Sequence, residues 1–175
     1  MARLLWLSLW GGLLGTNLLA DAIEFQVTSI GLSSYRYTYF VSNTTFELDQ
    51  VLDIRFDPTL YGTLSNGVAG SDFFVLLLQP NTPPGTFGDY NAEALANNPS
   101  LAVPFSVDFI FHGSGQPGAQ PFFIDQFDAK GNFVSVLDSG STAEVPEPRS
   151  VWLAGVVFLI ILSALRRRSR GSIAH

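Results

Sequence analysis

The stretch Val103-Pro104-Phe105-Ser106-Val107-Asp108-Phe109-Ile110-Phe111 decides the fold class of this chain. Apolar side chains occupy every second position, and Pro, Ser and Asp stand between them. Successive side chains of a β-strand point to opposite faces, so this pattern predicts a strand with one buried face. Pro104 lacks the N–H that a sheet ladder needs, so we expect the start of the run at a sheet edge or a bulge.

The same two-residue period recurs along the chain, at residues 23–27, 35–41 and 52–56. Three further apolar runs, 73–78, 122–127 and 133–137, are also predicted strands, the first apolar enough for burial on both faces. Turn-forming residues separate these runs, and residues 128–132 predict a hairpin loop. Residues 90–97 suggest one or two helical turns.

About seven short strands with frequent turns predict an all-β fold, an antiparallel β-sandwich that is Ig-like or jelly-roll-like. We place this ectodomain at residues 23–138 and a linker at 139–148.

The charge of the predicted ectodomain is strongly one-sided. Residues 23–143 hold twelve acidic residues, whereas their bases are Arg36, Arg55 and Lys130. Nucleic-acid binding depends on clustered Lys and Arg, so no nucleic-acid partner is expected. The absence of Cys excludes disulfides, thiol chemistry and thiolate metal sites.

The N-terminus predicts a secretory signal peptide over residues 1–22. A basic start with Arg3 precedes an apolar segment at 4–14, and Ala20-Asp21-Ala22 forms a small-x-small cleavage site. Cleavage after Ala22 would follow export through the Sec translocon; an uncleaved anchor is the alternative.

The C-terminus predicts a transmembrane helix and a basic tail over residues 149–175. The apolar run 151–165 would reach about 22 Å as a helix, short of a ~30 Å hydrocarbon core, and flanking arginines could extend that reach. The cluster of Arg166, Arg167, Arg168 and Arg170 predicts that the tail stays cytoplasmic. The ectodomain would then lie outside the inner membrane.

Pro146-Glu147-Pro148, the apolar run and the arginines occur in an order that resembles the PEP-CTERM sorting signal of Gram-negative bacteria, over residues 144–170. The two prolines bias the backbone toward an extended form that a protease can bind. The resemblance implies processing by an exosortase, a membrane-embedded Cys-protease-like enzyme, and a link to exopolysaccharide. Five residues follow Arg170, where many members stop sooner; a plain tail anchor is the alternative.

Few residues offer catalytic chemistry. A Ser-His-Asp triad could be written with Ser106 or Ser114, His112 and Asp108, but the segment around His112 lacks the G-x-S-x-G spacing. We therefore expect no triad.

Two pairs of carboxylates, Asp49 with Asp53 and Asp125 with Asp128, could lie near each other, as glycoside hydrolysis requires. Asp125, Asp128 and Asn132 could surround a calcium ion, although the EF-hand spacing is missing. We expect these acids to be solvated, and no catalytic residue, metal or cofactor is predicted.

The leading hypothesis is an exported, non-enzymatic surface or matrix protein that reaches the cell surface after tail processing. One alternative is a carbohydrate-binding module of the matrix, in which Tyr35, Tyr37 and Tyr39 form an exposed stacking platform. The other is a plain tail-anchored periplasmic protein.

Overall fold

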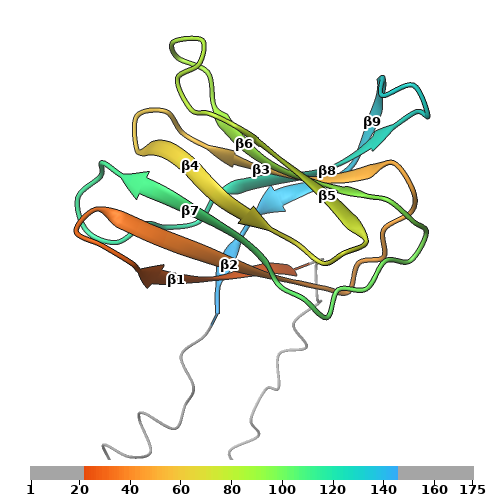
Figure 1. Cartoon of the computed structure of the whole chain (residues 1–175), viewed down its shortest axis with the longest axis horizontal. Helices are drawn as coiled ribbons and strands as arrows, with labels where there is room; N and C mark the ends of the chain where they lie inside the picture. Colours follow the sequence, from red (N-terminus) through yellow and green to blue (C-terminus); the bar gives the residue numbers. More distant parts are fainter. Residues whose placement is uncertain (1–21, 146–175) are drawn as a thin grey trace, which may run out of the picture.

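The computed structural model describes residues 22–145, which form a sandwich of two five-stranded β-sheets (Figure 1). Sheet A has the order β10-β1-β2-β7-β4. Its strands are β1 (Ala22–Ser29), β2 (Ser34–Ser42), β4 (Tyr61–Val68), β7 (Phe105–Phe111) and β10 (Ala143–Glu144). Sheet B has the order β5-β6-β3-β8-β9. Its strands are β3 (Gln50–Phe56), β5 (Phe73–Leu78), β6 (Gly88–Ala94), β8 (Pro121–Phe127) and β9 (Phe133–Ser141).

Neighbouring strands pair antiparallel except for β1 and β10, which pair in parallel. The predicted all-β sandwich is confirmed, and ten strands replace the expected seven. The predicted hairpin at 128–132 joins β8 to β9.

The core lies between the sheets and is unusually aromatic. Most inward residues of β2, β3 and β7 are fully or almost fully buried, and the rings of Tyr37 and Phe109 stack with their centroids 4.5 Å apart. Each of these strands points every second side chain inward, which explains the period seen in the sequence.

Two predictions about strands are corrected. The β5 strand lies at the edge of sheet B. It is not buried on both faces, because Phe74, Leu76 and Leu78 point outward and are about half exposed. Residues 90–97 contain no helix; β6 covers 88–94, and its Tyr90, Ala92 and Ala94 enter the core.

The strands also extend into the range predicted as a linker. The β9 strand continues to Ser141, and β10 pairs with β1 through Glu24↔Ala143 and Phe25↔Glu144. Pro104 lies just before β7, a central strand whose ladder it therefore does not interrupt.

The signal peptide, the Pro146-Glu147-Pro148 motif, the apolar run and the arginine cluster lie outside the described residues, apart from Ala22 at the start of β1. Between residues 22 and 145, no helix is long and apolar enough to cross a membrane.

Candidate functional site

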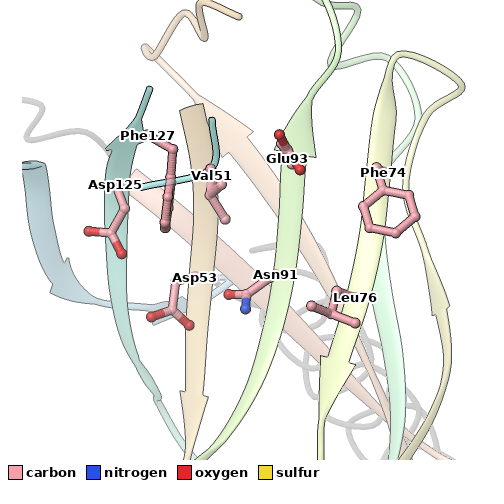
Figure 2. A pocket seen from close by; sticks show the side chains of 9 residues that line it. Val51, Asp53, Phe74, Leu76, Asn91, Glu93, Asp125 and Phe127 are labelled. Carbon is pink, nitrogen blue, oxygen red and sulfur yellow. The ribbon is translucent and has the colours of Figure 1, made fainter. Parts of the chain in front are cut away.

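A depression of about 300 Å³ lies on the outer face of sheet B (Figure 2). Strands β3, β5, β6 and β8 supply its floor, and Gly131 of the β8–β9 hairpin supplies part of its wall. Its lining combines apolar and acidic side chains: Val51, Asp53, Phe74, Leu76, Asn91, Glu93, Asp125 and Phe127.

Strand register brings the acidic residues of this face together. Within β3, Leu52, Ile54 and Phe56 enter the core, so Val51, Asp53 and Arg55 point outward. The neighbouring strands place Glu93 and Asp125 opposite Val51, and Asp89 opposite Arg55. Residues from three sequence regions therefore share one surface.

Arg55 is the basic residue on this acidic face. Its Nε donates to Oδ2 of Asp53 at 3.0 Å, and its guanidinium lies 4.1 Å from the ring centroid of Phe123. Arg36 is on sheet A, and Lys130 belongs to the hairpin turn.

The carboxylates of this face are unusually shielded from water. Asp53 is 6% exposed and Asp125 is 8% exposed. The Oδ1 atoms of Asp53, Asp89 and Asp125 are buried and accept no hydrogen bond from any described residue. Burial and the nearby charges of Asp89 and Asp125 raise the pKa of Asp53 to about 6, although Arg55 acts in the opposite direction. Burial also raises the pKa of Asp89 and of Asp125.

The structure regroups the carboxylates that the sequence suggested as pairs. Asp53 and Asp125 lie on one face, each from a different predicted pair. Asp49 occupies a turn with φ of 65°. Asp128 accepts hydrogen bonds from the backbone of Lys130 and from Asn132 within its own turn.

Two residues of the suggested calcium site bind each other, since the side-chain amide of Asn132 donates to the carboxylate of Asp128. The carboxylate of Asp128 is bound by its own hairpin. Across residues 22–145, no three His, Asp or Glu side chains are grouped so that they could hold a metal ion.

The residues of the suggested triad do not converge. Asp108 forms a two-pronged ion pair with Arg36, at 2.6 and 2.9 Å, and also accepts from Asn66. The hydrogen bond from Arg36 lowers the pKa of Asp108. His112 follows β7 and is exposed. Asp108 is therefore part of a link between strands of sheet A.

The tyrosine platform is not available for stacking. Tyr37 and Tyr39 are 0% exposed, and Tyr35 is only partly exposed and packs beside Phe109 and Phe111. The hydroxyls of Tyr37 and Tyr39 bind the side chain of Gln120 inside the sandwich.

Sequence reasoning missed Asp89, Asn91 and Glu93. They alternate with Tyr90, Ala92 and Ala94, so a period of two was present. Alanine and glutamate favour helices, which hid the signal.

The fold and site together define an all-β sandwich with an acidic depression on one outer face. No family model matches the chain, and no curated protein matches it. Among solved structures, it is similar to a cohesin module from a Clostridium perfringens ATCC13124 family 33 glycoside hydrolase. The two are 11% identical with a TM-score of 0.37, over 71% of this chain and 98% of the module.

Proposed function

We propose that this protein is an exported, non-enzymatic surface or matrix protein whose C-terminal signal directs it to an exosortase. The Sec translocon would export it, and the apolar run 151–165 would hold it in the inner membrane until the tail is processed. The protein would then reach the cell surface or the extracellular matrix, in association with exopolysaccharide.

The observation that carries this proposal is how close in sequence the strands of the sandwich come to the motif. The backbone N–H of Val145, the residue after β10, donates to the carbonyl of Phe25 at 2.9 Å, and Pro146 is the next residue in the sequence. Cleavage at a motif that follows β10 in the sequence would leave the strand pairing of residues 22–145 in place. At the other end, the predicted cleavage point precedes Ile23, the first core residue, which is 2% exposed.

A non-enzymatic role is supported by the contacts of the candidate catalytic residues. Asp108 is held by Arg36 and Asn66, and Asp128 by its own turn. The carbohydrate-binding alternative loses its proposed platform, since Tyr37 and Tyr39 fill the core. A plain tail anchor is tested by the same experiment as the sorting signal.

The test compares the wild-type chain with a variant in which Pro146, Glu147 and Pro148 are all replaced by Ala, both expressed in the native host. Ser150→Ala serves as a control in the same segment. We expect wild type and control to lose the apolar run and leave the inner membrane, and the triple variant to keep both. Intact mass and fractionation measure this. If all three chains keep their tails in the inner membrane, the segment is a plain anchor.

A further inference from the structure

We propose that the depression on the outer face of sheet B binds an organic cation, in the form of a primary ammonium group on an apolar stem.

The outer face of sheet B carries more acidic than basic side chains at the depression. Asp53, Asp89, Glu93 and Asp125 share a face on which Arg55 supplies the opposing charge. Arg55 is already engaged with Asp53 and stacked on Phe123. The face therefore keeps a surplus of negative charge, and a bound cation would lower its electrostatic energy.

Two carboxylates that line the depression have buried oxygens without a hydrogen-bond donor from residues 22–145. Asp53 and Asp125 are more than nine-tenths buried, both line the depression, and the Oδ1 atom of each has no hydrogen-bond donor among the described residues. Burying a charged oxygen without a partner is costly. A cation held in the depression would offset that cost. Its attraction to the carboxylates would act across a medium less polar than bulk water and would therefore be stronger.

The apolar part of the lining selects the kind of cation. Phe74 and Leu76 stand on the β5 side, and Val51 and Phe127 on the β3–β8 side (Figure 2). These side chains suit methylene groups, and aromatic rings also attract an ammonium group. A bare metal ion fits less well, because three carboxylates do not converge within residues 22–145. A neutral polyol would leave the surplus charge uncompensated.

The first test is a calorimetric titration of the full chain in detergent with 1,5-diaminopentane, and with 1,5-pentanediol as the uncharged analogue. We expect saturable binding of the diamine and none of the diol. Asp125→Asn should weaken diamine binding roughly tenfold or more, the scale of one lost charged contact. Glu24→Gln, which removes one charge from sheet A, should change it less than twofold.

Amide chemical shifts locate the bound diamine on the protein. They should change in β3, β6 and β8 and stay constant in sheet A. Acidification through pH 6 should weaken binding, because Asp53, whose pKa is raised to about 6 beside Arg55, takes up a proton there. The raised pKa values of Asp89 and Asp125 act in the same direction. Saturable binding of the diol in place of the diamine, equal loss in Glu24→Gln, or no saturable binding overturns the proposal.

Discussion

At the scale of single residues, Asp53 is an acidic side chain in a place where burial disfavours its charged form. Its carboxylate is buried beside Asp89 and Asp125, and its pKa rises to about 6. The native state therefore binds more protons than the unfolded state between about pH 4 and 6. Stability should fall as pH rises through that window and stay low above it.

Asp53→Asn removes this ionisation. We expect the variant to be more stable than wild type by about 1–3 kcal/mol at pH 7.5, and equal to it below pH 4. Urea unfolding at several pH values measures the difference. A variant less stable than wild type at pH 7.5 would show that the ion pair with Arg55 outweighs the burial of the carboxylate.

Gln120 has the opposite character, a buried polar side chain with all its partners in place. It is 1% exposed and contacts the hydroxyls of Tyr37, Tyr39 and Tyr61 and the carbonyl of Gly118. Gln120→Leu should destabilise the fold by roughly 2–4 kcal/mol, since it removes the acceptor of the buried Tyr39 hydroxyl and the amide donor to the hydroxyls of Tyr37 and Tyr61. Thermal unfolding measures this, with the exposed Gln116→Leu as control. Equal stabilities for the two variants would contradict the network's role.

At the scale of elements, four runs with a period of two and three further apolar runs predicted seven strands. The other strands escaped for identifiable reasons. In β4 the pairing with β7 shifts register twice, and Asn66 adopts φ of 49°, so the period breaks. In β6 the inward side chains of Ala92 and Ala94 are small, and packing against the opposite sheet overrides their helix propensity.

The β9 strand is an exposed edge of sheet B. Phe133, Val134, Val136 and Leu137 are about half exposed, and Asp138 is the one charged residue of the strand. Apolar edges of this kind favour association. Val134→Lys should therefore reduce concentration-dependent self-association while changing stability by less than about 1 kcal/mol. Light scattering during a concentration series tests this, with Val103→Lys in a loop as control; equal behaviour of the two variants would exclude the β9 edge.

At the scale of the whole molecule, the depression could not be predicted from the sequence. Its acids come from β3, β6 and β8, and only the pairing of Val51 with Glu93 and Asp125 brings them together. Sequence spacing instead suggested acids within one segment, such as Asp125 with Asp128. Neighbours across a sheet depend on register, which a single sequence does not reveal.

The short β10 strand closes the domain beside β1. Thr142 N–H donates to the Gln120 carbonyl at 2.8 Å, and Val145 N–H donates to Phe25. A chain of residues 22–145 should unfold cooperatively, and one ending at Ser141 should be less stable by roughly 2–4 kcal/mol, the scale of the lost hydrogen bonds. Urea unfolding of both chains measures the difference. Equal stability would show that β10 does not hold the domain together.

We propose that the folded domain is released from two removable ends. Terminal peptide mapping of the wild-type protein, recovered from the outside of its native host cells, tests this claim most directly. We expect a chain that begins at Ile23 and lacks residues 151–165. A protein that keeps both Met1 and His175 would contradict it.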